Sequence, residues 1–138
     1  MHTTIDWLLL EQEARNAARR AYVPYSHFTV GASILTSDNQ IFTGCNIENA
    51  SYGLSICAER TAIFSSRVNG GMSDIKALCV YTPTRLPTPP CGACRQVLNE
   101  FGPQMHVQLI CDDTNHRIIT TLDALLPGAF GPKNLETR

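Results

Sequence analysis

The sequence has little excess charge of either sign and lacks a long apolar run. Eleven Lys and Arg residues against twelve Asp and Glu leave a net charge of −1 across 138 residues. Nucleic acid phosphates are bound by clustered Lys and Arg, and the one small cluster, Arg15, Arg19 and Arg20, is typical of a solvated helix face. No apolar run approaches the ~18–20 residues that span a bilayer. We therefore expect neither a nucleic acid polymer nor a membrane as partner.

The start of the sequence also lacks the features of a secretory signal. Residues 1–6 contain no Lys or Arg, and the apolar stretch that follows, residues 7–10, ends at Glu11. These absences predict a soluble, cytoplasmic protein. The length predicts a single domain over residues 1–138, which is large enough to bury roughly 68% of its unfolded surface.

The six cysteines do not predict a disulfide framework, because disulfides are rare in intracellular proteins. Cys79 and Cys111 lie in or at the end of apolar runs, and cysteine packs as a small hydrophobic residue. Both are therefore predicted at buried strand positions. The other four stand beside Gly, Asn, Glu or Pro, where chemistry is expected: Cys45, Cys57, Cys91 and Cys94.

Helical and strand patterns alternate along the chain. Apolar residues at helical spacing predict a first helix over residues 5–21, opened by a Thr3-x-x-Asp6 capping box and ended by Pro24. Alternating apolar residues over residues 28–34 predict a half-buried strand. The other expected strands are residues 41–43, 75–82, 107–111 and 117–120, and the other expected helices are residues 57–67, 92–101 and 122–126. This order predicts an α/β fold, a three-layer α/β/α sandwich around a mixed five-stranded sheet.

Two helix starts carry residues suited to a metal. Cys57-Ala58-Glu59 opens one helix, and Pro90-Cys91-Gly92-Ala93-Cys94 opens the next. Three thiolates from Cys57, Cys91 and Cys94 can converge on one Zn²⁺, because the last two are three residues apart on a first helical turn. Glu59 cannot share the ligand direction of Cys57 on a helix and instead flanks the open fourth position. Three protein ligands with one open position are the arrangement of catalytic zinc.

A non-catalytic zinc module is the alternative to this interpretation. A lone Cys-x-x-Cys is more often a structural zinc or redox motif, and structural zinc needs four protein ligands. Cys45, His106 and His116 are the candidates for a fourth ligand, but none stands at ligand spacing from the other three. The histidines are instead typical of surface or packing positions.

The sequence resembles the small, homotetrameric cytidine deaminases of pyrimidine nucleoside salvage. A metal ligand followed by x-Glu, and then by Pro-Cys-x-x-Cys, is the general signature of zinc deaminases. The segments that carry the resemblance are residues 25–28, 30–32, 44–52, 56–62, 90–97, 125–127 and 130–132. Blasticidin-type deaminases share the zinc motif, but the Asn46-x-Glu48 pair and the Leu-Leu-Pro tail favour a cytidine deaminase.

The resemblance implies an activity and a mechanism: hydrolytic deamination of cytidine and 2′-deoxycytidine to uridine and 2′-deoxyuridine, with release of ammonia. One Zn²⁺ per chain would lower the pKa of its bound water toward ~7. Glu59 would move protons from that water to N3 and then to the amino group. Arg60 would donate hydrogen bonds to the ligand sulfurs, which reduces the negative charge of a shell with three thiolates.

The resemblance also implies how the nucleoside is bound. Asn46 and Glu48 would hydrogen-bond the ribose 3′-hydroxyl, and Phe28 would pack against the pyrimidine. The Ala58 backbone and the Glu59 side chain would contact the base edge. A homotetramer is expected as the assembly.

In that assembly, two aromatic residues are expected to act between subunits. Phe130 would reach the site of a neighbouring subunit, and Tyr52 would lie at the same interface. The small-molecule nucleoside and further copies of this chain are therefore the expected partners.

Overall fold

The computed structural model describes residues 4–71 and 73–136. Its helices and strands, in chain order, are α1 (Trp7–Ala18), β1 (Gly31–Thr36), β2 (Ile41–Cys45), the 3-10 helix η1 (Tyr52–Leu54), α2 (Ala58–Val68), β3 (Ile75–Tyr81), α3 (Gly92–Phe101), β4 (His106–Ile110), β5 (Arg117–Thr121), α4 (Leu122–Leu125) and α5 (Pro132–Glu136). Within the described ranges, none of the helices has the length and apolar content needed to cross a membrane.

The strands form one mixed sheet in the order β2-β1-β3-β4-β5. Pairing is antiparallel except between β3 and β4, which run parallel. A parallel pair needs a crossover connection, and here α3 provides it. The expected mixed five-stranded sheet is thereby confirmed.

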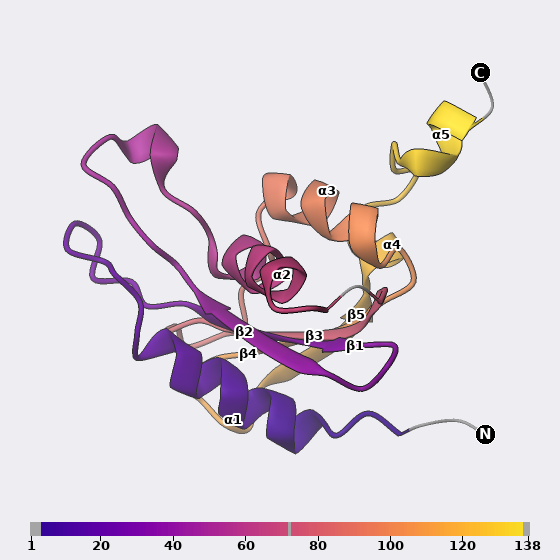
Figure 1. The fold of residues 1–138 in the computed structure, drawn as a ribbon. Helices are drawn as coiled ribbons and strands as arrows, with labels where there is room; N and C mark the ends of the chain where they lie inside the picture. Colours follow the sequence, from indigo (N-terminus) through magenta and orange to yellow (C-terminus); the bar gives the residue numbers. More distant parts are fainter. Residues whose placement is uncertain (1–3, 72, 137–138) are drawn as a thin grey trace.

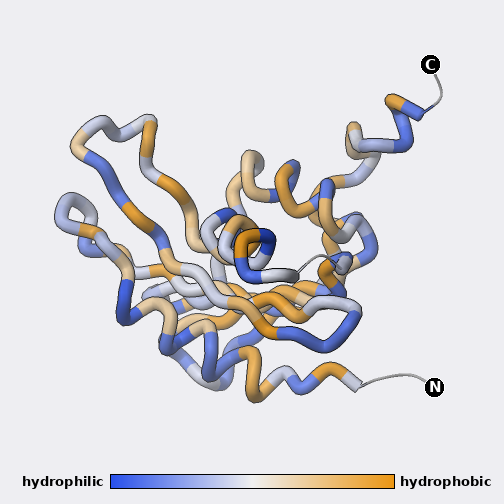
Figure 2. The backbone as a smooth tube through the Cα atoms, viewed as in Figure 1, coloured by the Kyte–Doolittle hydropathy of each residue, from blue (hydrophilic) through white to orange (hydrophobic). Residues whose placement is uncertain are grey.

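Helices cover both faces of the sheet, as Figure 1 shows: α1 lies on one face, and α2 and α3 lie side by side on the other. Successive residues of β3 point to opposite faces. Leu78 and Val80 pack in the core beneath α2 and α3, whereas Ala77 and Cys79 pack against α1. Apolar residues are concentrated along the central strands (Figure 2). The three-layer α/β/α sandwich is the fold that the sequence predicts.

Two glycines let the helices approach the sheet closely. A Cβ at Gly31 would lie 1.9 Å from the Ala14 carbonyl oxygen of α1. A Cβ at Gly44 would lie 2.3 Å from the Ala62 nitrogen of α2. Both distances are shorter than atoms can tolerate, so glycine at these two positions sets the distance of α1 and α2 from the sheet.

The first helix ends earlier than its pattern predicts. Asp6 is the N-cap, and its side chain accepts a hydrogen bond from the Leu9 N–H at 3.2 Å. Thr3 of the expected capping box lies outside the described residues. The helix ends at Ala18 rather than near Pro24, because the chain then turns to pair with another segment: Tyr22 forms a parallel bridge with Ile47.

The half-buried strand expected over residues 28–34 is wrong in both extent and burial. Strand β1 begins at Gly31, after Phe28 and Val30, and all six of its residues are buried. It is flanked by β2 and β3 and packed by helices on both faces, so neither its edges nor its faces meet solvent. A strand in this position has no exposed side to carry polar residues.

Candidate metal centre and active site

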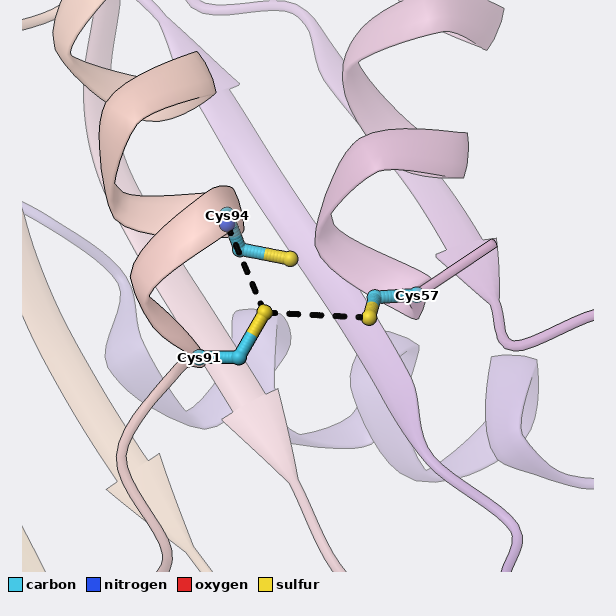
Figure 3. Close-up of side chains that lie close together, drawn as sticks. All are labelled: Cys57, Cys91 and Cys94. Atoms are coloured by element: carbon cyan, nitrogen blue, oxygen red, sulfur yellow. Dashed lines mark hydrogen bonds between the residues drawn. The ribbon is translucent and has the colours of Figure 1, made fainter. Parts of the chain in front are cut away.

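The three cysteines of the predicted metal site come together at the starts of two neighbouring helices. Cys57 is the N-cap residue of α2, and Cys91 is the N-cap residue of α3. Cys94 lies one turn further along α3. Figure 3 shows the three side chains pointing toward one another from these two helices.

The spacing of the sulfurs suits a zinc ion. The three Sγ atoms lie within 4.8 Å of one another, and those of Cys57 and Cys91 are 4.0 Å apart. A tetrahedral zinc with Zn–S bonds of about 2.3 Å requires sulfurs about 3.8 Å apart, so only a small adjustment is needed. Across the described residues, no other group of His, Cys, Asp or Glu could hold a metal ion in this way.

Hydrogen bonds and positive charge around Cys57 stabilise the ionised form of this thiol. Arg60 Nη2 donates a hydrogen bond to Cys57 Sγ at 3.3 Å. The Cys94 thiol and the Arg60 guanidinium lower the pKa of Cys57 to about 5. The Cys94 N–H donates to Cys91 Sγ at 3.4 Å. Each helix N-terminus adds roughly half a positive charge, so the surroundings offset part of the negative charge of three thiolates.

A cavity of about 220 Å³ adjoins the cysteine cluster at Cys57. It is lined by Phe28, Val30, Asn46, Cys57, Ala58, Glu59, Val80, Thr82, Thr88 and Pro89. Glu59 is 4% exposed, and burial raises the pKa of its carboxyl group to about 7. A carboxylate with a pKa near neutral can both accept and donate a proton under ordinary conditions.

Asn46 joins the cavity to the segment that carries Phe28. Its Nδ2 donates to the Phe28 carbonyl oxygen at 2.7 Å, and its Oδ1 accepts from the Val30 N–H at 2.9 Å. These two bonds fix the backbone on either side of residue 29 and place the Phe28 side chain at the cavity wall. The sequence suggested only a contact between Asn46 and the ribose, and these hydrogen bonds to the backbone were not predicted.

Glu48 and Tyr52 line a different cavity, of about 360 Å³, together with Tyr25, Ser26 and Ser55. Glu48 Oε1 accepts hydrogen bonds from the N–H groups of Tyr25 at 3.1 Å and Ser26 at 3.2 Å. Hydrogen bonds from the Ser26 side chain and from these N–H groups hold the pKa of Glu48 below its usual value. The rings of Tyr25 and Tyr52 form a T-shaped pair with 5.7 Å between their centroids. A single chain therefore does not bring Glu48 and Tyr52 into the cavity beside the cysteines.

Phe130 also lies outside that cavity. Its carbonyl oxygen accepts hydrogen bonds from Gln96 Nε2 at 2.9 Å and Asn99 Nδ2 at 3.3 Å, which attach the tail to the exposed side of α3. The Phe130 side chain remains 60% exposed. In this position the Phe130 side chain can contact another molecule, but it does not line the cavity of its own chain.

Sequence reasoning missed several residues of the site. Thr82, Thr88 and Pro89 line the cavity. Their only signal was position: Thr82 ends a predicted strand, and the other two stand between that strand and the cysteine motif. Arg95 was missed as well: its Nε donates to the Pro90 carbonyl oxygen and its Nη1 to that of Leu125, both at 2.8 Å. Arg95 thereby holds the loop that leads into Cys91.

The fold and the site together define a class of protein. Three cysteine ligands leave one position of a tetrahedral zinc open to water or substrate, as in catalytic zinc sites. A buried glutamate beside that position, on this α/β/α fold, is the arrangement of a zinc-dependent deaminase.

Comparisons with known proteins agree with this class. The family model for the cytidine and deoxycytidylate deaminase zinc-binding region matches residues 7–110. The cytidine deaminase of Halalkalibacterium halodurans is 44% identical over 134 residues, which cover 95% of this chain and 98% of that protein. The cytidine deaminase of Sporosarcina psychrophila is 48% identical over 126 residues, covering 89% and 90%.

Solved structures give the same result. The crystal structure of the Burkholderia pseudomallei cytidine deaminase has a TM-score of 0.84 and 45% identity, and covers 92% of this chain and 100% of that one. The Mycobacterium tuberculosis cytidine deaminase has a TM-score of 0.79 and 41% identity, with coverage of 93% and 99%. The chain belongs to the cytidine and deoxycytidylate deaminase family. The resemblance drawn from the sequence and the zinc cofactor are confirmed.

Proposed function

We propose that this enzyme catalyses the zinc-dependent hydrolytic deamination of cytidine and 2′-deoxycytidine, yielding uridine and 2′-deoxyuridine with release of ammonia. The observation that carries the proposal is the position of Glu59, which is buried in a cavity beside the three cysteines. The names of relatives that cover almost the whole chain support the substrate.

The proposed mechanism assigns the proton transfers to Glu59. When held by Cys57, Cys91 and Cys94, zinc supplies the chemistry that makes water nucleophilic near neutral pH. Glu59 accepts a proton from the attacking water and delivers it to N3, so that C4 becomes electrophilic. It then takes the remaining proton of that water from the new C4 hydroxyl and passes it to the amino group, which leaves as ammonia while the oxygen stays on C4 as the keto group. One carboxylate can serve both steps because the transfers follow one another.

Four residues are proposed to bind the nucleoside. Phe28 at the cavity wall packs against the pyrimidine, and the Ala58 backbone contacts the base edge. An Asn side chain has two donors and two acceptor positions. Asn46 uses one of each on the backbone, which leaves one donor and one acceptor for the ribose hydroxyl. Glu48 approaches the ribose from the neighbouring cavity.

We propose a homotetramer in which neighbouring subunits complete the site. Tyr52 is 74% exposed and Phe130 is 60% exposed, and neither lines the cavity beside the cysteines of its own chain. The side chains of both residues are large and apolar, so burial at an interface between copies is favourable.

We also propose that residues 1–138 form a single domain and that the enzyme works in the cytoplasm. The single-domain proposal is supported by the one sheet on which both apolar cores are built. The cytoplasmic location rests on the sequence alone.

An assay of ammonia release tests the proposed function. The zinc-loaded protein is incubated with cytidine, 2′-deoxycytidine or blasticidin S, with and without a chelator that removes zinc. We expect release from both nucleosides and none after chelation. Activity on blasticidin S alone would indicate a blasticidin-type deaminase. Release from none of the three, by protein shown to contain zinc, would indicate a non-catalytic zinc module.

A further inference from the structure

Thr82 is a buried polar residue of the active-site cavity to which the mechanism above gives no task. It follows the last residue of β3 and is 4% exposed. Its N–H donates to the Ile110 carbonyl oxygen at 3.2 Å, so the backbone continues the sheet at this point. Thr82 lines the same cavity as Glu59 and Phe28. A buried hydroxyl in a substrate cavity can distinguish ligands that differ in their donors and acceptors.

The hydrogen bonds of neighbouring residues determine which way the Thr82 hydroxyl donates. Thr84 Oγ1 donates to the Leu86 carbonyl oxygen at 2.6 Å, and a carbonyl can only accept. Thr82 Oγ1 and Thr84 Oγ1 are 2.7 Å apart. A threonine hydroxyl has one proton and two lone pairs. Because the proton of Thr84 is engaged by Leu86, Thr82 is the donor in the bond between the two threonines.

The consequence is that Thr82 can offer only lone pairs to a molecule in the cavity. Substrate and product differ at C4 of the pyrimidine, where an amino group donates hydrogen bonds and a keto oxygen accepts them. An amino group gains a hydrogen bond from an acceptor, whereas a keto oxygen at the same place faces another lone pair and leaves both groups unpaired.

We propose that Thr82 is a specificity-determining residue whose hydroxyl accepts a hydrogen bond from the 4-amino group of the substrate and disfavours the 4-keto product. The inference rests on the proposed deamination of cytidine and adds the residue that distinguishes substrate from product. Thr84 is the positioning residue, because its bond to Leu86 keeps the proton of Thr82 directed away from the cavity.

The first test removes the Thr82 hydroxyl. Thr82→Val keeps the shape of the side chain, and the readout is the KM for cytidine together with the Ki of uridine as a competitive inhibitor. We expect KM to rise and Ki to stay or fall, so that the ratio Ki/KM drops about three- to tenfold, the value of one neutral hydrogen bond. Thr82→Ser keeps the hydroxyl and should restore the ratio.

Controls separate this effect from a general change in structure. Thr120→Val makes the same chemical change on β5, away from the cavity, and should leave the ratio unchanged. Zinc content and the thermal unfolding midpoint are measured for every variant. If Thr82→Val does not fold, Thr82→Ala removes the same hydroxyl without the added methyl group.

A second variant changes the direction of the hydroxyl without removing it. Thr84→Val deletes the acceptor for the Thr82 proton, so that Thr82 becomes free to donate into the cavity. Uridine should then bind more tightly than to wild type, by about three- to tenfold. A loop that is merely loosened would weaken both ligands.

Three results would overturn the inference. The first is an unchanged Ki/KM ratio in Thr82→Val. The second is a higher ratio in that variant, which would mean that the hydroxyl accepts a hydrogen bond from the N3–H of uridine. The third is equal weakening of both ligands in zinc-loaded Thr84→Val. Failure of the proposed function is distinguishable from these, because wild-type protein would then release no ammonia from cytidine.

Discussion

Glu59 shows how burial and chain position together give one side chain its chemistry. It follows Cys57 by two residues, so the first turn of α2 directs its side chain away from the cysteine ligand and into the cavity. Burial raises the pKa of this carboxyl group to about 7, because the charged form loses its solvation. Its neighbour in sequence, Arg60, instead contacts Cys57 Sγ. Two adjacent residues thus face the cavity and the Cys57 sulfur separately.

The first prediction tests Glu59 as the group that moves protons. Glu59→Gln is expected to retain zinc, because Glu59 is not a ligand, and to lower kcat by about 10²- to 10⁴-fold, the usual contribution of general acid–base catalysis. Steady-state assays with parallel metal analysis measure both properties. Glu100→Gln, at an exposed position on α3, is the matched control. Near-normal turnover by zinc-loaded Glu59→Gln protein would contradict the mechanism.

The second prediction concerns the metal ligands. Wild-type protein should contain one zinc per chain. Replacing Cys57, Cys91 or Cys94 by Ala should remove the metal and lower the free energy of unfolding, because zinc binds the folded chain only. Cys79→Ala, a cysteine of the opposite face of the sheet, should retain zinc. Full metal occupancy in Cys91→Ala would show that the ligand set is wrong.

At the scale of secondary-structure elements, the residues of the candidate site lie at the N-termini of helices and at the ends of strands. The N-terminal ends of α2 and α3 place all three cysteines. The end of β3 places Thr82, and the bonds of Asn46 hold Phe28 ahead of β1. Residues of the candidate site thereby come from segments far apart in sequence but adjacent in the fold, as is common where strands of an α/β sheet end.

A pH prediction follows from the place of β3 between two helical layers. Burial, together with the nearby Glu11 carboxylate, raises the pKa of Cys79 to about 12, from an ordinary value of 9.0. The folded state therefore keeps a proton that the unfolded state loses. The stability from this thiol is complete below about pH 9 and is lost as pH rises toward 12.

The free energy of unfolding should fall above pH 9 more steeply in wild type than in Cys79→Ala. The expected difference in slope is at most about 1.4 kcal/mol per pH unit for one group. Urea denaturation of zinc-loaded protein at pH 8, 9, 10 and 10.5 measures it. Parallel curves for the two proteins would show that Cys79 titrates alike in folded and unfolded chains.

The sequence predicts best the boundaries of helices that have capping residues at one end and Gly or Pro at the other. Helix α3 has the predicted bounds, because Cys91 caps it and Gly102 and Pro103 end it. Helix α2 is displaced by one residue, since Cys57 is its cap rather than its first residue. Burial of β1 could not be predicted, because it depends on strands that follow it in sequence.

Within the candidate site, the zinc triad was predictable and the substrate residues were less so. Spacing within one motif places Cys91 and Cys94 on one helical turn, and the packing of α2 beside α3 brings Cys57 to them. The location of Glu48 depends on the pairing of its segment with Tyr22, a contact between distant segments that no motif contains. The hydroxyl of Thr82 became a candidate only when its partners and burial were known.

At the scale of the whole molecule, large apolar side chains outside the core point to an assembly. The tail with α5 extends away from the sheet in Figure 1, and Phe130 on that tail is 60% exposed. Tyr52 is exposed as well, on a loop that also projects from the body of the molecule. In the proposed assembly, a site completed by a neighbouring copy would give both residues a function and bury them at the same time.

The last prediction tests this assembly in two stages. Light scattering should give the mass of a tetramer, four times 15.2 kDa. Phe130→Ala should raise the KM for cytidine about tenfold and leave zinc content unchanged, because an aromatic contact is worth roughly 0.5–1.5 kcal/mol beyond the area it buries. Phe64→Ala, at another exposed phenylalanine that we do not place in the site, is the matched control.

Mixing two variants then shows which subunit Phe130 serves. Glu59→Gln chains and Phe130→Ala chains, each with a different affinity tag, are unfolded and refolded together, and assemblies that carry both tags are purified. In such assemblies, some Phe130→Ala chains with an intact Glu59 receive Phe130 from a Glu59→Gln neighbour. At cytidine concentrations well below KM, their activity should exceed that of the two variants refolded separately. If doubly tagged assemblies show no gain, Phe130 acts within its own chain, and the shared site is excluded.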